Sequence, residues 1–467
     1  MGKWVAVRLI LLCALLAAGV PSSAQSALQQ EFQSAVSAYN AHDYSRAAAQ
    51  LERLVPRVPN SFEAHELLGL VYAAQQKLQQ SAEQLQIAVR LKPDSAAART
   101  NLATSLLHAG KPAAAEEQFR KALALEPDDF QANHNLAEFY LQSGKIAQAI
   151  PLLERARQIQ PAAYDNGYNL ALAYFLTGRL EDARGLVEQL EKQQDTGELH
   201  NLLGKIDEKQ GKFLDAAKEL QAAAQMDPSE DNLFAWGSEL LLHRNYEPAI
   251  QVFQKATERF PRSPRLWIGL GMALYSRGQY EESIKALLTA ADLNPRDARC
   301  YLFLSKAYLS SPSQADKVIE RFRRYAALEP RNALAQYYYA VSLWKGKRSE
   351  ANSINYPLVE SLLRKSIALN DKLAEAHLQL GILYADQREY AKSLPQYTRA
   401  IELNPNLPDA HYRLGQYYVH AGEKERAQQE FQKFQKLQAD HQAVLDKERA
   451  EVRQFVLSSS TPQQAQP

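Results

Sequence analysis

The sequence predicts an all-α protein in which one pair of antiparallel helices is repeated along a chain of 467 residues. Three observations lead to this prediction. Prolines recur with a single period, small residues recur in pairs within that period, and turns containing glycine separate the members of each pair. A period of about 20 to 50 residues is typical of a solenoid, in which chain length measures the number of repeats rather than the number of globular domains.

Proline marks the end of each repeat. The first four prolines of this series are 34 residues apart, and the later ones keep the same phase with small shifts. The series comprises Pro59, Pro93, Pro127, Pro161, Pro228, Pro261, Pro295, Pro330 and Pro405. Because proline cannot continue a helix, we expect it to end the second helix of each pair.

Two small residues lie 12 positions apart in each repeat, as Gly69 and Ser81 do. A small side chain allows two helix axes to approach closely. An apolar residue precedes the first small residue, and an aromatic residue such as Tyr72 often follows it three positions later, which is the spacing of one helix face. Turns such as Ala-Gly-Lys at 109–111 lie between the two small residues. Each repeat is therefore predicted to be a helix, a short turn and a second helix.

With these positions the chain resembles the tetratricopeptide repeat (TPR) family, whose 34-residue unit has the same small, aromatic, alanine and proline positions. Trp267, Gly271, Ala290 and Pro295 illustrate the match within one repeat. The resemblance implies a right-handed superhelical solenoid of antiparallel helix pairs with about twelve repeats. The repeats begin at Leu28, Phe62, Ala96, Phe130, Tyr164, Gly197, Glu230, Pro264, Ala298, Ala333, Ala374 and Pro408.

The repeats place the solenoid at residues 25–441, followed by two C-terminal segments. Residues 442–456 keep a helical pattern with many charges, as expected of a helix that covers the last repeat. Residues 457–467 are rich in Ser and Gln and are expected to be disordered. The tenth repeat is seven residues longer than the 34-residue period. The additional residues fall in a polar loop at 345–357. This loop is either a tolerated surface insertion or a contact with a partner.

Residues 1–24 have the organisation of a signal peptide. Lys3 and Arg8 precede an apolar run of about 12 residues, and small residues then lead to Ala24. The run is shorter than the roughly 20 residues that cross a bilayer. We therefore expect cleavage after Ala24 and export to a periplasm or out of the cell. An uncleaved signal that anchors the chain is the alternative, and membrane association is otherwise expected to be indirect.

Composition argues against nucleic acid as a ligand. The formal net charge is +1, with 54 Lys and Arg against 53 Asp and Glu, so there is no basic surplus to neutralise a phosphate backbone. Removal of residues 1–24 would leave Cys300 as the single cysteine. The exported chain could then form no internal disulfide, and we expect Cys300 to be a small buried group.

No catalytic or metal-binding motif accompanies the repeats. The H-E-x-x-H, G-x-S-x-G, P-loop and paired-cysteine patterns do not occur in the sequence. Four histidines share one repeat position with Trp267 and Tyr301, which indicates packing rather than metal ligation: His65, His200, His377 and His411. We therefore expect neither an enzyme nor a cofactor, a metal or a small-molecule substrate.

The TPR resemblance implies a protein–protein interaction scaffold that binds an extended peptide or a partner protein in a concave groove lined by the first helices. Asn101, Asn135 and Asn169 occupy the same position in three successive repeats. Their amides would form a row that can pair with the main chain of a peptide. This row resembles the asparagine ladder of O-linked N-acetylglucosamine transferases. Solvated asparagines at a permissive position would give the same pattern, and both interpretations stay open.

Two further groups of residues are expected to line the groove. The first is polar and comprises His134, Tyr168 and Asn201. The second would give the later repeats an aromatic surface and comprises Tyr337, Tyr338, Trp344 and Tyr412. Packing between repeats is the alternative for each of these side chains.

Two other binding roles are possible for a protein of this family. The carboxylate clamp of chaperone-binding TPR modules is not supported, because Thr104 and Glu138 stand where its second asparagine would fall. An assembly factor for an outer-membrane, secretion or polysaccharide-export complex is the alternative to a general scaffold.

The signal-peptide interpretation predicts the mature N-terminus. If export removes residues 1–24, the intact mass of the protein recovered from its native compartment will correspond to a chain that begins at Gln25. A mass that includes residues 1–24 would instead support the uncleaved anchor.

Overall fold

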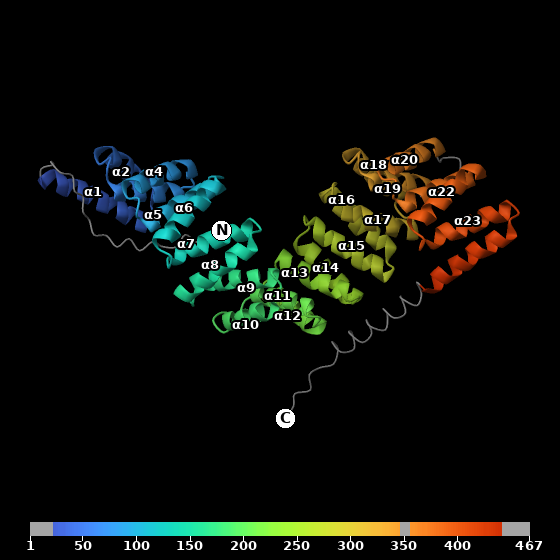
Figure 1. Ribbon diagram of the computed structural model, residues 1–467, viewed down its shortest axis with the longest axis horizontal. Coiled ribbons are helices and arrows are strands. Elements are labelled where there is room, and N and C mark those ends of the chain that lie inside the picture. Colours follow the sequence, from blue (N-terminus) through green and yellow to red (C-terminus); the bar gives the residue numbers. More distant parts are fainter. Residues whose placement is uncertain (1–21, 346–354, 441–467) are drawn as a thin grey trace, which may run out of the picture. The chain divides into compact units, whose positions relative to one another are not determined.

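The computed structural model describes residues 22–345 and 355–440, and over these residues it contains helices and short connections but no strand (Figure 1). The predicted all-α fold is confirmed. Predicted features that lie outside the described residues are most of the signal peptide, most of the 345–357 loop, and the segments 442–456 and 457–467. The chain divides into an N-terminal unit that ends at Asp195 and a C-terminal unit that begins at Thr196.

The N-terminal unit contains the first ten helices and one 3-10 turn. They are α1 (Ser22–Asn40), α2 (Tyr44–Leu54), the 3-10 turn η1 (Val55–Arg57), α3 (Phe62–Ala74), α4 (Leu78–Leu91), α5 (Ala96–His108), α6 (Pro112–Leu125), α7 (Phe130–Gln142), α8 (Ile146–Ile159), α9 (Tyr164–Leu176) and α10 (Leu180–Glu191).

The C-terminal unit continues the same alternation. Its helices are α11 (Gly197–Lys209), α12 (Phe213–Met226), α13 (Glu230–Leu242), α14 (Tyr246–Arg259), α15 (Pro264–Arg277), α16 (Tyr280–Leu293), α17 (Ala298–Ser310), α18 (Ala315–Leu328), α19 (Ala333–Lys345), α20 (Tyr356–Leu369), α21 (Ala374–Asp386), α22 (Tyr390–Leu403) and α23 (Pro408–His420). Residues 424–440 are also helical.

The first helix of every repeat from the second to the twelfth begins at the residue that the sequence predicts. The first repeat differs, because α1 begins at Ser22, ahead of the predicted Leu28, and includes the last three residues of the predicted signal peptide. Several first helices begin after a Ser, Asp or Thr whose side chain accepts a backbone N–H, as Ser95 does from Ala98. Such caps satisfy N–H groups that have no partner within the helix.

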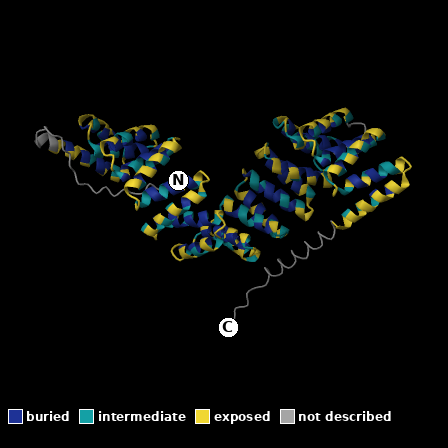
Figure 2. Ribbon diagram, in the orientation of Figure 1, coloured by how far each residue is buried: buried dark blue, intermediate teal, exposed yellow. Residues whose placement is uncertain are grey.

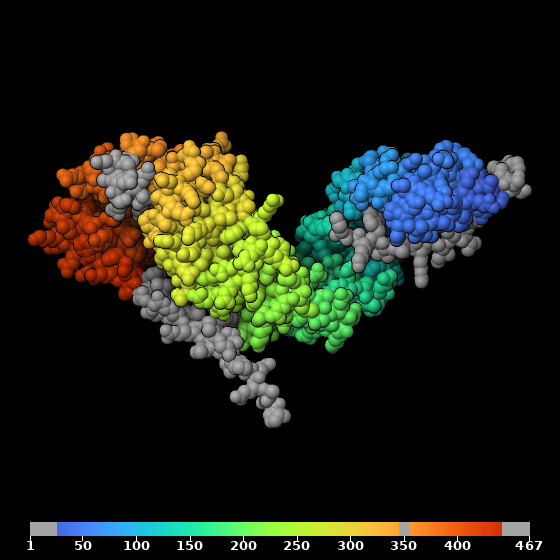
Figure 3. Space-filling model, turned by 180° about the vertical axis from the view of Figure 1, so that it is seen from behind, coloured from blue at the N-terminus to red at the C-terminus, as the bar shows by residue number. Residues whose placement is uncertain are grey.

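Within each unit the helices form two rows. Each helix packs against its neighbour in the chain, and the first helices also contact one another in series, α1 to α9 in the N-terminal unit and α11 to α19 in the C-terminal unit. Buried residues follow the faces where helices meet, and exposed residues follow the outer faces (Figure 2). In the space-filling view the repeats of each unit succeed one another in sequence order (Figure 3).

The close crossing of the two helices in a repeat depends on the first small residue. A Cβ built on Gly271 of α15 would lie 2.5 Å from Cγ of Leu287 in α16, and one on Gly69 would lie 2.5 Å from Cγ of Leu85. The hydroxyl of Ser283 donates to the backbone oxygen of Gly271 at 2.7 Å. The first small residue of each pair is therefore required, because a large side chain of the second helix occupies the space beside it. This large side chain lies 16 positions later in the sequence, as Leu287 does after Gly271.

In several repeats the residue at the histidine position contacts the backbone at the end of the previous repeat. The Trp267 indole donates to the backbone oxygen of Pro261 at 2.9 Å, and the Tyr301 hydroxyl donates to that of Pro295 at 3.0 Å. Imidazole Nε2 of His411 lies 2.9 Å from the backbone oxygen of Pro405, and His65 and His377 approach the equivalent oxygens. These contacts explain why chemically different side chains replace one another at this position.

Cys300 is buried in α17, as expected, and its thiol donates to the backbone oxygen of Asp297 at 3.0 Å. Burial raises the pKa of this thiol to about 12, which keeps it protonated and unreactive at neutral pH.

The longer ninth and tenth repeats keep their helices and absorb the additional residues in the turn between them. Three residues separate α5 from α6, whereas Ser311–Gln314 separates α17 from α18, and the tenth repeat interposes residues 346–355 between α19 and α20. Among the described helices, none is both long enough and apolar enough to cross a bilayer.

The helix crossing predicts opposite effects of the same substitution at two glycines. Gly271→Ala should reduce the free energy of unfolding by roughly 1–3 kcal/mol, because the new Cβ overlaps Leu287. Gly185→Ala, within α10, should raise it by roughly 0.5–1 kcal/mol, because no atom lies within 4 Å of the added group and alanine favours the helix. Urea unfolding followed by circular dichroism measures both. Equal effects at the two positions would contradict the account.

Candidate functional site

Three asparagines stand in register on successive first helices of the N-terminal unit. Asn101 lies on α5, Asn135 on α7 and Asn169 on α9, each at the sixth position of its repeat, and all three are half-buried. The amide of Asn101 donates to Glu66 Oε1 on the preceding first helix at 3.4 Å. That bond uses one of its two N–H groups and leaves its oxygen without a donor among the described residues.

The other two asparagines of the row differ in how many hydrogen bonds they make to other described side chains. The amide of Asn135 donates to Thr104 Oγ1 at 3.2 Å, and its oxygen accepts from Gln131 Nε2 at 2.5 Å. Asn169 makes no side-chain hydrogen bond to any residue that the structure describes. The row of amides exists in the predicted register, with two of its members also joining adjacent repeats. Its use as a peptide ladder stays a prediction.

Glu66 on α3 lies next to this row, and the sequence did not single it out. It accepts from Asn101 and is half-buried. Burial raises its pKa to about 7, with a further increase from Glu63 and partial offsets from Asn101 and Lys92. Glu66 occupies the same repeat position as His134 and Tyr168, so the phase of those residues could have identified it.

The predicted polar residues have different environments. His134 on α7 stacks on Phe130, with ring centroids 5.6 Å apart, and its Nδ1 lies 3.3 Å from Asn166 Oδ1. Tyr168 on α9 is half-buried beside Asn169. Both remain available to a ligand over part of their surface.

Asn201 does not line an open surface, contrary to the prediction. It is only 9% exposed, and its amide donates to Asn232 Oδ1 on α13 at 2.8 Å. Asn232 in turn donates to the backbone oxygen of Asp227 at 2.8 Å. The Asn201 side chain therefore links two neighbouring first helices and is not available to a ligand.

The predicted aromatic surface of the later repeats is wrong for two of its four residues. Tyr338 is 6% exposed and packs on Phe322 of α18, with ring centroids 5.8 Å apart. Trp344 is 3% exposed and belongs to a core that includes Val359 and Leu363 of α20. Both side chains fill space between helices, which is the packing alternative.

The remaining two aromatic residues retain some surface. Tyr337 is half-buried, its ring meets that of Tyr338 edge-on, and burial raises the pKa of its phenol. Tyr412 on α23 is 37% exposed and packs against Phe434, with ring centroids 5.1 Å apart. The amide of Gln416 donates to its hydroxyl at 3.1 Å.

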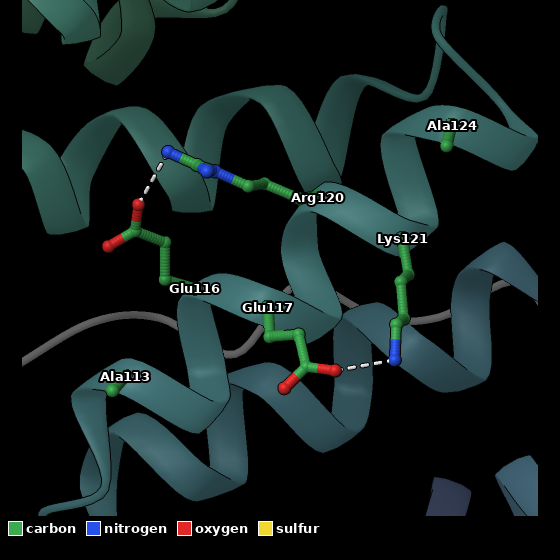
Figure 4. A pocket seen from close by; sticks show the side chains of 6 residues that line it. All are labelled: Ala113, Glu116, Glu117, Arg120, Lys121 and Ala124. Atoms are coloured by element: carbon green, nitrogen blue, oxygen red, sulfur yellow. Dashed lines mark hydrogen bonds and ion pairs between the residues drawn. The ribbon is translucent and has the colours of Figure 1, made fainter.

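A shallow pocket on the exposed face of α6 is not part of the asparagine row (Figure 4). Its charged side chains pair within the helix, Lys121 with Glu117 at 2.5 Å and Arg120 with Glu116 at 2.8 Å. Exposed pairs of this kind are typical of a solvated helix surface and contribute little energy.

The stacked helix pairs, the proline and small-residue positions and the linked first helices define a helical-repeat protein. Models of the tetratricopeptide repeat match residues 32–99, 100–164, 234–298 and 378–441, and a second such model matches residues 140–206. These matches cover more than half of the chain, which therefore belongs to the TPR family. Membership in this family supports a role in protein–protein interaction. The matched scaffold proteins are generally non-catalytic.

Two curated proteins match parts of the chain. Protein O-mannosyl-transferase TMTC1 of Homo sapiens is 24% identical over 158 residues, or 33% of this chain. Anaphase-promoting complex subunit 3 of Schizosaccharomyces pombe is 25% identical over 186 residues, or 40% of this chain. The chain spans only 17% and 27% of the lengths of these two relatives.

Solved structures with similar folds include the Naa15/Naa10 complex bound to HypK-THB, with 19% identity, a TM-score of 0.34, and coverage of 87% of this chain and 68% of that chain. The APC/C hetero-tetramer Cut9-Hcn1 has 15% identity, a TM-score of 0.38, and coverage of 89% and 94%. MamA has 21% identity, a TM-score of 0.29, and coverage of 37% and 97%. Scores of this size do not define a shared arrangement of the repeats.

The environment of Glu66 predicts a pH-dependent effect of its removal. The raised pKa means that the folded protein holds this proton up to about pH 7, whereas the unfolded chain releases it near pH 4.3. Ionisation of Glu66 therefore costs nothing below about pH 4 and up to about 3 kcal/mol above about pH 8. Glu66→Gln should accordingly stabilise the protein relative to wild type by an amount that grows between pH 4.5 and 8.

Urea unfolding at several pH values measures this difference. Glu117→Gln, on the exposed face of α6, is the control and should not show the same increase with pH. A difference between Glu66→Gln and wild type that stays constant with pH would show that the carboxyl group is not buried as described.

Proposed function

We propose that this protein is a non-enzymatic scaffold that binds an extended peptide or a partner segment along the first helices α5, α7 and α9. The observation that supports the proposal is the register of Asn101, Asn135 and Asn169 on three consecutive first helices, each half-buried and accessible. An asparagine amide offers both a donor and an acceptor, so it can pair with a peptide main chain whatever the side chains of the peptide are.

The contacts of the row assign different roles to its members. Asn169 brings an amide that is not engaged by any described side chain, and Asn101 keeps an unused N–H group. Asn135 is hydrogen-bonded to both Thr104 and Gln131, so its amide is held in a fixed orientation and has less capacity left for a peptide. His134 and Tyr168 lie next to these amides in the sequence and offer ring surface to side chains of the peptide.

The family supports a binding role without naming a partner. The relative from Schizosaccharomyces pombe is by its name a subunit of a multiprotein complex, which agrees with a scaffold. The relative from Homo sapiens is by its name a transferase, but the match spans only 17% of its length. We further propose that the protein is exported and acts in a periplasm or outside the cell, where a role in assembling a secretion or envelope complex would be the special case.

The row predicts the outcome of a triple substitution. Asn101→Ala, Asn135→Ala and Asn169→Ala together should weaken binding of a peptide ligand at least tenfold, because each lost hydrogen bond costs about 0.5–1.5 kcal/mol. Helical content and melting temperature should stay near wild type, because the two inter-repeat hydrogen bonds that are lost, to Glu66 and Thr104, are only partly buried and lie outside the packed cores. Fluorescence anisotropy with a peptide from a captured partner measures the affinity.

A control replaces asparagines in turns outside the row, whose side chains accept a backbone N–H. Asn294→Ala and Asn404→Ala, which follow α16 and α22, should leave peptide affinity unchanged. Equal affinity of the wild type and the triple variant would refute the ladder, and the asparagines would then be solvated residues that join repeats.

A further inference from the structure

Two neighbouring first helices of the C-terminal unit bring together an imidazole and two carboxylates. Glu208 lies near the end of α11, Glu239 lies in the last turn of α13, and His243 is the C-terminal capping residue that follows α13. One ligating atom from each residue lies within 4.8 Å of those of the other two. None of these residues takes part in the asparagine row.

The distances within this cluster match the edges of a metal coordination sphere. His243 Nε2 lies 3.1 Å from Glu208 Oε2 and 3.2 Å from Glu239 Oε1. Nitrogen and oxygen ligands about 2.1 Å from one divalent ion are separated by roughly 3.0 Å in an octahedral arrangement and roughly 3.4 Å in a tetrahedral one. Both measured distances fall in this interval.

The single N–H of the imidazole Nε2 can satisfy only one of the two carboxylates. Nε2 of an imidazole carries at most one proton, and its hydrogen bond is to Glu208 at 3.1 Å. Glu239 is only 6% exposed, and its Oε1 has no hydrogen-bond partner among the residues that the structure describes, although Nε2 lies near it. A buried carboxylate oxygen without a partner is costly, and this one points at the same nitrogen as Glu208.

The surroundings allow an ion to enter and to be held. About 30% of the Glu208 side chain is exposed, which leaves a route from solvent and room for water as a further ligand. The ring of Phe213 on α12 lies 4.2 Å from the imidazole, centroid to centroid, and fixes its orientation. The end of α13 presents backbone carbonyl groups, whose partial negative charge favours a cation.

We propose that Glu208, Glu239 and His243 form a binding site for a divalent transition-metal ion, with Zn²⁺ the first candidate. An imidazole ligand favours Zn²⁺ and its neighbours in the first transition row over Mg²⁺ or Ca²⁺, which prefer oxygen ligands alone. Because Glu208 belongs to the sixth repeat and the other two ligands to the seventh, the ion would join two repeats.

No sequence motif indicated this site, and the sequence analysis predicted no metal. Glu239 and His243 have the spacing of one helical turn, but the third ligand precedes them by nearly a whole repeat, and that spacing corresponds to no known metal-binding motif. Only the contact between α11 and α13 brings the three together. The competing interpretation is a hydrogen-bonded triad in which Glu239 is protonated and no metal binds.

Isothermal titration calorimetry of the full chain with ZnCl₂, after removal of metals with a chelator, distinguishes the two. We expect one saturable site per chain with a dissociation constant of about 1 µM or below. Glu239→Gln and His243→Gln should each weaken it at least about 100-fold, since loss of a direct ligand should exceed the roughly 10–100-fold effect of its outer hydrogen-bond partners. Glu430→Gln is the matched control and should leave this site unchanged.

Glu430 is a suitable control because it is similarly buried and contacts a histidine, His411, at 2.6 Å, but has a lysine rather than a second carboxylate beside it. Zn²⁺ should also raise the melting temperature of wild type and Glu430→Gln but not of Glu239→Gln.

The melting temperatures of the variants without metal show whether a loss of Zn²⁺ binding results from misfolding. Glu239→Gln should then melt at or above the wild-type temperature, because the neutral amide removes an unsatisfied buried charge. Absence of a saturable site in wild type, or an equal affinity in wild type, Glu239→Gln and His243→Gln, would overturn the proposal in favour of the hydrogen-bonded triad.

Discussion

The close crossing of the two helices within each repeat is the interaction on which the rest of the structure depends. Glycine or alanine at the eighth position of a repeat leaves space that a large side chain of the second helix fills, as Leu287 does beside Gly271. This contact fixes the angle of each pair and so places the next first helix against the previous one. Every polar contact between first helices, including those of the asparagine row, requires that spacing.

The sequence was sufficient to predict the starts of the first helices, because proline, small residues and turns are local signals that recur with the repeat. It could not predict which face of a first helix stays open. Tyr338 shares its repeat position with the asparagines of the row, and Trp344 lies on the same first helix, α19, yet α18 and α20 cover them. Asn201 is likewise covered by Asn232. Such burial depends on the side chains of the neighbouring repeat, whose size and orientation a periodic pattern does not encode.

Polar side chains between first helices serve two purposes in this chain. Asn201 with Asn232 forms a buried link, whereas Asn101 with Glu66 forms a link that is partly open to solvent. The cluster of Glu208, Glu239 and His243 extends this principle, since two carboxylates face one imidazole and a metal ion would complete their contacts. At a link that is partly open to solvent, a ligand can replace or add to the existing hydrogen bonds. Among the asparagines of the row, Asn169 makes the fewest hydrogen bonds within the protein.

Site-specific photo-crosslinking in the native host tests the central claim, that partners bind along the row of first helices, most directly. A photoreactive amino acid at Asn169 of α9 should form a discrete crosslinked complex with a protein partner, and the same amino acid at Lys121, on the exposed face of α6, should not. Complexes of equal yield at both positions, or only at Lys121, would contradict the claim and place the binding surface elsewhere on the repeats.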